Sequence, residues 1–167
     1  IELFWRDRKT FKNVDYWISY SFLDTKRDYL NYPFEVQPDF AAKHTASLVY
    51  KHYIPKITTN FGLTYSFATG RPYYDPNKPT GAFMTDKTIN YHALGLSASY
   101  LTTIRKAFTV FVLSVSNVVG NKQVFGYRYS TDKLRREEIT PNAPRFIFIG
   151  MFMSFGIDRR QDVINNN

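Results

Sequence analysis

A strict alternation of side-chain types over long stretches limits what this chain can fold into more than any other feature. From residue 57 to residue 68 the odd positions are Ile, Thr, Phe, Leu, Tyr and Phe, whereas the even positions are Thr, Asn, Gly, Thr, Ser and Ala. Successive side chains of a β-strand point to opposite faces, so this period of two predicts a strand with one apolar and one polar face. Helical spacing is nearly absent. We therefore expect an all-β, antiparallel fold.

The same pattern predicts about seven strands. They are expected to begin at the N-terminus and near Val14, His44, Ile57, His92, Phe108 and Arg145, with the clearest alternation in residues 15–23, 57–68, 93–101, 108–118 and 145–157. The polar face is mostly Ser, Thr, Gly, Ala and Asn, whereas the water-facing side of a soluble sandwich usually carries Lys, Glu and Thr. Such a face suits the crowded, partly wet interior of a barrel.

The connections between the expected strands alternate in length. Short links fall at residues 8–13, 54–56 and 102–106, and long links at 30–43, 74–90 and 131–144. Outer-membrane barrels have short periplasmic turns and longer extracellular loops, and their tilted strands need about 9 to 11 residues to span the membrane. Seven antiparallel strands that begin and end in the same direction cannot close on themselves. We therefore expect more strands before Ile1 and a chain that is part of a larger barrel.

The composition fits a barrel wall. Aromatic residues make up 18% of the chain, about twice the share expected of a soluble domain. The mean hydropathy of -0.36 agrees with strands that alternate lipid-facing and lumen-facing residues. We expect the rings in aromatic girdles at the two membrane interfaces. The expected girdle residues are Tyr16, Trp17, Tyr53 and Tyr100 at the periplasmic rim and Phe67, Tyr73, Tyr74, Tyr91, Tyr127 and Tyr129 toward the outside.

Several function classes are disfavoured by what the sequence lacks. The formal net charge is +8, but the basic residues are scattered over turns and loops, so nucleic acid is not an expected partner. The chain has no Cys, and His44, His52 and His92 show no metal-ligand spacing and are expected to be structural or interfacial. No Gly-x-Ser-x-Gly motif and no pair of acids on rigid elements is present. We therefore expect no enzyme activity, no catalytic or metal-binding residues and no cofactor.

Four local patterns between residues 40 and 155 resemble the C-terminal barrel of TonB-dependent outer-membrane receptors. They are Lys-His-Thr-Ala-Ser-Leu at 43–48 followed by Tyr50, Phe-Ala-Thr-Gly-Arg-Pro-Tyr at 67–73, Val-Ser-Asn-Val-Val-Gly-Asn-Lys-Gln-Val-Phe at 115–125, and Pro-Arg-Phe at 144–146 leading to a strand that ends Met-Ser-Phe at 153–155. The third is the most specific. In many barrels the final aromatic is the last residue, whereas here a polar tail follows. The tail and the Gly-Arg-Pro-Tyr-Tyr segment look most like versions from Bacteroidota.

The resemblance implies that residues 1–157 are about seven C-terminal strands of a transmembrane barrel of about 22 strands, and that residues 158–167 are a polar C-terminal tail. It further implies a receptor in the outer membrane of a Gram-negative cell, which takes up an iron chelate, glycan, peptide or vitamin with energy coupling. The implied partners are outer-membrane lipid and lipopolysaccharide, an N-terminal plug domain and the remaining barrel strands, TonB acting through the missing N-terminal region, and a small or oligomeric substrate.

Two other hypotheses stay open at this point. Eight strands suffice for a closed barrel, so a small stand-alone structural barrel or adhesin would fit if the chain held one more strand. A soluble antiparallel β-sandwich would be preferred if the chain stayed monomeric in buffer without detergent. For a barrel fragment we instead predict aggregation without detergent, because its edge strands would expose unpaired backbone groups and an apolar face.

The candidate ligand-contact residues lie in the long links. Lys133, Arg135 and Arg136 belong to residues 131–144, where mixed charge indicates either a solvated, mobile loop or contacts to lipopolysaccharide phosphates or an anionic substrate. The planar guanidinium of Arg suits the second hypothesis, because it binds phosphate or carboxylate through two hydrogen bonds. Tyr73 and Tyr74 are candidates for stacking on a substrate, against a purely structural role.

Overall fold

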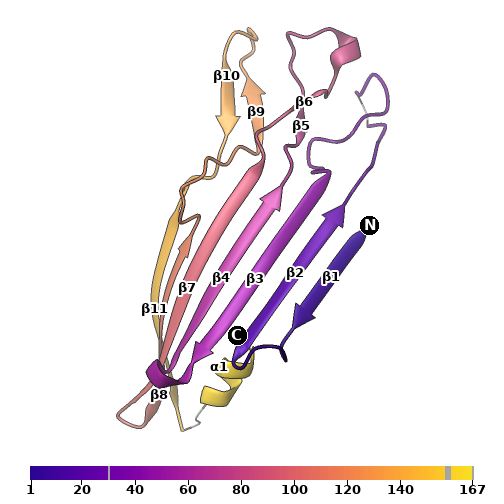
Figure 1. Cartoon of the computed structure of the whole chain (residues 1–167). Helices are drawn as coiled ribbons and strands as arrows, with labels where there is room; N and C mark the ends of the chain where they lie inside the picture. Colours follow the sequence, from indigo (N-terminus) through magenta and orange to yellow (C-terminus); the bar gives the residue numbers. More distant parts are fainter. Residues whose placement is uncertain (30, 157–158, 167) are drawn as a thin grey trace.

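A seven-stranded antiparallel sheet dominates the computed structural model, which describes residues 1–29, 31–156 and 159–166 (Figure 1). Its strands are β1 (Glu2–Asp7), β2 (Val14–Phe22), β3 (His44–Ile54), β4 (Thr59–Ala68), β7 (Tyr91–Ile104), β8 (Ala107–Ser116) and β11 (Phe146–Phe155). Each of these strands pairs with the next one along the chain, so the sheet is an up-and-down meander. The prediction of an all-β, antiparallel fold is confirmed, and the main sheet has the seven strands that were expected.

The remaining elements lie in the connections. Two small sheets, β5 (Pro72–Tyr73) with β6 (Asp86–Lys87) and β9 (Gly126–Tyr129) with β10 (Arg136–Ile139), stand beyond one end of the main sheet, which we call the loop end (Figure 1). The helix α1 (Arg160–Asn166) lies at the opposite end, the turn end. Short 3-10 helices are η1 (Pro55–Ile57) and η2 (Thr80–Ala82). Residues 131–144, expected to be a loop, thus contain a strand paired with β9.

The connections alternate in length as predicted. At the turn end η1 and Thr58 join β3 to β4, and only Arg105 and Lys106 join β7 to β8. Both residues of this two-residue turn have positive φ angles, 46° and 67°, which is the conformation that tight hairpins favour. At the loop end the links cover residues 23–43, 69–90 and 117–145.

Two strands are shorter than predicted because the side-chain alternation continues into residues whose backbone is not extended. The strand expected from Ile57 begins at Thr59, since η1 ends at Ile57 and Thr58 adopts a φ of 46°. The strand expected to reach residue 118 ends at Ser116, since Asn117 adopts a φ of 47°. The expected boundary between barrel and tail, at residues 157 and 158, lies outside the described residues.

The register sorts the side chains of the main sheet onto two faces. Ser47 pairs with Ser66, and Gly62 pairs with Ser97, which pairs with Ser114. Directly opposed residues point to the same side of a sheet, so these small residues form one surface, which we call the hydroxyl face. The alternate positions form the apolar face. At mid-sheet the apolar face carries Ile18, Leu48, Leu63, Leu96, Leu113 and Ile149.

The apolar face is open over much of its area. Leu96, Leu113 and Ile149 are 42%, 47% and 79% exposed, so no described element covers this part of the sheet. A soluble sandwich would bury the same positions against a second sheet. Within the described residues, no helix is long and apolar enough to cross a membrane.

The segment after β11 packs on the other face. Val163 and Ile164 of α1 contact a small cluster formed by Leu101, Phe108 and Val110, which lies at the turn end of the hydroxyl face. The residues expected to form a polar tail therefore include a short helix whose apolar side chains rest on the sheet.

Candidate functional site

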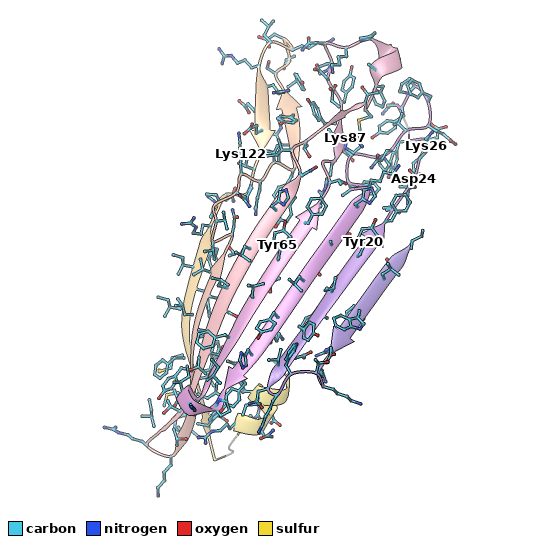
Figure 2. All side chains as sticks on the ribbon, viewed as in Figure 1. Tyr20, Asp24, Lys26, Tyr65, Lys87 and Lys122 are labelled. Atoms are coloured by element: carbon cyan, nitrogen blue, oxygen red, sulfur yellow. The ribbon has the colours of Figure 1, made fainter. Side chains whose placement is uncertain are left out.

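Tyrosine and histidine pairs mark the loop end of the apolar face. The Tyr20 hydroxyl lies 2.7 Å from Nδ1 of His44, and the Tyr65 hydroxyl lies 2.8 Å from Nδ1 of His92. Figure 2 labels both tyrosines, one on β2 and one on β4. Each pair satisfies polar ring atoms on an otherwise apolar surface, which is what amphipathic rings at a boundary between water and an apolar phase require.

The two pairs are copies of one arrangement. Tyr-Ser-Phe occurs at residues 20–22 and again at 65–67, each time followed across the strand pair by a His. The ring centres of Phe22 and His44 are 5.2 Å apart, and those of Phe67 and His92 are 5.1 Å apart. The arrangement occurs on the β2–β3 and β4–β7 strand pairs, so aromatic rings and polar ring atoms lie together near the loop end of the apolar face.

Three of the residues expected in the aromatic girdles lie on the hydroxyl face instead. The register pairs Trp17 with Val49, Tyr53 with Asn60 and Tyr91 with Ala68. These girdle assignments are therefore wrong, because a ring on this face cannot reach the medium that contacts the apolar face. Two cations lie over the Trp17 ring, with Arg6 5.0 Å and Lys51 5.1 Å from its centre.

A recess lined by aromatic side chains lies among the small sheets at the loop end, and we call it the loop recess. Its volume is about 610 Å³. The residues around it include Tyr32, Tyr73, Tyr74, Phe83, Phe125, Tyr127, Tyr129, Lys133 and Ile139. Most of these rings come from loops far apart in sequence, so the main sheet and the two small sheets bring them together. An aromatic wall of this kind can stack on a flat ligand or on the apolar face of a sugar ring.

Arg136 stands among the tyrosines of this region. Its guanidinium donates a hydrogen bond to the Tyr73 hydroxyl at 3.2 Å and lies 4.4 Å from the centre of the Tyr127 ring. The rings of Tyr73 and Tyr127 are 4.5 Å apart. The neighbouring Tyr129 hydroxyl raises the pKa of Arg136, and burial raises the pKa of Tyr129. Arg136 is thus a fixed cation that orders tyrosines from two different loops.

The structure places most of the five candidate ligand-contact residues in or beside the loop recess. Tyr73, Tyr74 and Lys133 line the loop recess, and Arg136 is bonded to Tyr73. Arg135 does not line it. Its backbone N–H donates to the Ser130 hydroxyl at 3.0 Å and its carbonyl accepts the Ser130 N–H at 3.0 Å, so it closes the β9–β10 hairpin turn.

A second recess, which we call the wall recess, lies on the hydroxyl face toward the loop end. Its volume is about 690 Å³. Hydroxyl groups line it from four strands and a loop, namely those of Ser19, Ser21, Thr45, Ser47, Ser66, Thr69, Tyr91 and Thr88. Phe125 belongs to both recesses. The two recesses therefore adjoin, one among the loops and one on the sheet beneath them.

Arg71 is the one arginine or lysine among the described residues that line the wall recess. Its position follows from a tight crossing of two loop segments. The Gly70 N–H donates to Oδ1 of Asn90 at 2.9 Å, and the Arg71 N–H donates to the Thr88 hydroxyl at 3.0 Å. The Thr88 N–H donates back to the Arg71 carbonyl at 2.9 Å. The guanidinium lies 6.0 Å from the centre of Phe125, whose ring stacks on Tyr91.

The sequence pattern did not identify Arg71, Phe83 or Phe125 as site residues. Arg71 was visible only as part of the Gly-Arg-Pro-Tyr motif, and Phe125 only as the aromatic that ends the pattern at 115–125. Their roles depend on loops that meet across the end of the sheet, which alternation along one strand does not reveal.

The described residues hold no group of three or more His, Asp or Glu side chains that could bind a metal ion. Comparison of the chain with models of protein families, with curated proteins and with solved structures finds no match.

Proposed function

We propose that this chain is a wall segment of an outer-membrane β-barrel receptor that takes up a nutrient with energy coupling through TonB. The observation that carries the proposal is the division of seven strands into an uncovered apolar face and a hydroxyl face. Lipid would cover the first face, and the second would line a lumen. The implied partners are membrane lipid and lipopolysaccharide, further barrel strands beside β1 and β11, a plug domain and TonB.

The strand lengths suit a bilayer. At about 3.3 Å per residue, the 11 residues of β3 extend about 36 Å, and at a tilt of about 45° they would span about 26 Å. The apolar band of outer-membrane barrels is about 25 Å tall. The Tyr20–His44 and Tyr65–His92 pairs lie near the loop-end limit of this span, where an aromatic girdle is expected.

The two adjoining recesses supply the receptor part of the proposal. A ligand would meet the aromatic loop recess first and then the hydroxyl-lined wall recess, with Phe125 bordering both. Coupling to TonB rests on the resemblance of the four sequence motifs. Nutrient uptake that is unchanged in a cell without TonB would contradict that coupling.

Opposite-face lysine substitutions test the assignment of the two faces. Leu63 and Thr64 are neighbours near the middle of β4, and the register places them on the apolar and hydroxyl faces, respectively. In lipid vesicles Leu63→Lys should lower the free energy of unfolding by about 2–4 kcal/mol, the cost of a cation on the lipid side near the bilayer centre. Thr64→Lys, at an exposed position, should change it by less than about 1 kcal/mol, because the cation faces water.

Urea titration of the full-length gene product in vesicles measures both values, with outer-membrane abundance as a second readout. Equal costs for the two substitutions would contradict the membrane assignment. A monomer that stays soluble without detergent would favour a soluble sandwich.

A further inference from the structure

We propose that the wall recess binds a hydroxylated ligand that carries one carboxylate or phosphate group, and that Arg71 is the contact for that anion. The inference rests on the proposed transport function, and it names the class of ligand that would pass along the hydroxyl face. A sugar acid and a sugar phosphate share the required chemistry.

The guanidinium of Arg71 lacks an anionic partner within the described part of the chain. The ion pairs there involve other residues, and the Arg71 side chain makes no hydrogen bond to a described residue. Arg71 is only partly exposed and is held over the Phe125 ring. A guanidinium has five N–H donors in a planar fork that matches carboxylate or phosphate. A ligand anion would therefore supply the acceptors that the protein does not.

The backbone at Arg71 is fixed before any ligand arrives. Two hydrogen bonds join it to Thr88, and a third joins Gly70 to Asn90. Fixing a contact residue in advance reduces the entropy lost on binding. Arg136 differs in this respect, because tyrosines already occupy its guanidinium.

The rest of the lining favours a hydroxyl-rich ligand. Serine and threonine side chains can both donate and accept hydrogen bonds, as sugar hydroxyls do, and Ser19 and Ser47 already form such a pair at 2.7 Å. Tyr91 and Phe125 add ring faces beside Arg71. A neutral ligand would leave Arg71 without an acceptor.

Glu2 is the carboxylate that lines the recess among the described residues, and it lies far from Arg71. It belongs to β1, whereas Arg71 follows β4, and three strand spacings of about 4.8 Å separate those strands by about 14 Å. The anion of the ligand is therefore expected at the β4 side and its hydroxyl groups toward β1. A peptide could instead place its carboxylate at Arg71 and its ammonium at Glu2, but its side chains would then face hydroxyl groups.

Calorimetric titration of the full-length gene product in detergent micelles tests the proposal with four probes: galacturonate, glucose 6-phosphate, glucose and trialanine. Wild type should bind at least one of the two sugar anions more tightly than glucose, and the two arms separate carboxylate from phosphate. Arg71→Gln should weaken that binding about ten- to a hundredfold, the loss expected for a charge-assisted hydrogen-bonded contact. The matched control Arg105→Gln, in the two-residue turn at the other end of the sheet, should bind like wild type.

Three results would overturn the proposal: sugar anions that bind wild type no better than glucose, Arg71→Gln binding that equals wild type, or Arg71-dependent binding of trialanine alone. Circular dichroism and the heat-dependent gel shift of a folded barrel check that the variants fold. If Arg71→Gln does not fold, Arg71→Lys takes its place. It should bind the sugar anion several-fold more weakly than wild type, with an affinity that falls at high salt, because it keeps the charge but loses the planar fork.

Failure of this inference is distinguishable from failure of the proposed function. If the lysine substitutions at Leu63 and Thr64 differ as expected but no sugar anion binds, the barrel assignment stands and the ligand class is wrong. If the protein is soluble without detergent, the membrane function is wrong, and the same titration in buffer still decides whether Arg71 binds the anion.

Discussion

Asn117→Ala should lower the free energy of unfolding by about 3 kcal/mol or more and loosen the last hairpin of the sheet, β8 with β11. Asn117 is only 3% exposed. Its side-chain amide donates to the carbonyls of Asn121 and Pro144 at 2.8 and 2.7 Å, and its side-chain oxygen accepts the Asn121 N–H at 3.1 Å. Alanine would leave these three backbone groups without their partner, at about 1–3 kcal/mol for each that stays buried.

The backbone conformation adds to the cost at this position. Asn117 has a φ of 47°, in the left-handed region that Asn tolerates better than Ala. Arg145, which precedes β11, donates hydrogen bonds to the carbonyls of Asn117 and Val118 at 3.3 and 2.8 Å. A shift of Asn117 would therefore also disturb the start of the last strand.

Urea unfolding in lipid vesicles measures this effect, and Asn121→Ala provides the matched control. Asn121 contacts Asn117 only through its backbone N–H and carbonyl, so its alanine variant should stay within about 0.5 kcal/mol of wild type. Asn117→Gly separates the two causes, because glycine accepts the positive φ but makes none of the hydrogen bonds. A loss below about 1 kcal/mol for Asn117→Ala would contradict the assigned role.

The number and order of the strands could be predicted because each long strand carries its own signal. Leu63 and Thr64 fall on opposite faces in the sequence pattern and in the register alike. The ends of strands carried less information. Ile57 continues the alternation, yet it belongs to a 3-10 turn, and the turn depends on Pro55 and on the positive φ of Thr58. The helix α1 has only seven residues, too few for a periodic pattern to stand out.

The candidate site could be predicted only in part, because its geometry is long-range. Tyr73 and Lys133 were identified from loop position and residue type, and both line the loop recess. The motif that contains Arg71 did not reveal its role, because that role depends on Thr88, 17 residues after Arg71, and on Asn90, 20 residues after Gly70. Trp17 was assigned to a girdle from its ring and its place near the predicted periplasmic rim, whereas the register places it on the hydroxyl face.

Gly70→Ala should lower the free energy of unfolding by about 3 kcal/mol. It should also weaken ligand binding at the wall recess as much as Arg71→Gln does, although the guanidinium is still present. A Cβ at Gly70 would lie 1.9 Å from the Thr88 carbonyl oxygen and 3.0 Å from its carbon, so backbone and not a flexible side chain would have to move. Moving residues 70 and 88 apart strains the Gly70–Asn90 hydrogen bond and both Arg71–Thr88 hydrogen bonds.

Gly81→Ala is the matched control for this substitution, because a Cβ there meets no atom within 4 Å. It lies in η2 of the same long connection, and its alanine variant should fold and bind like wild type within about 0.5 kcal/mol. The free energy of unfolding reports the steric effect of the added Cβ, and the affinity for the sugar anion reports its effect on Arg71. If Gly70→Ala destabilised the protein but bound the sugar anion like wild type, the crossing at Thr88 would be needed only for folding. If neither value changed, the close approach of the two segments would be wrong. Joint loss of stability and binding, with Gly81→Ala unaffected, would show that the Gly70 crossing positions Arg71.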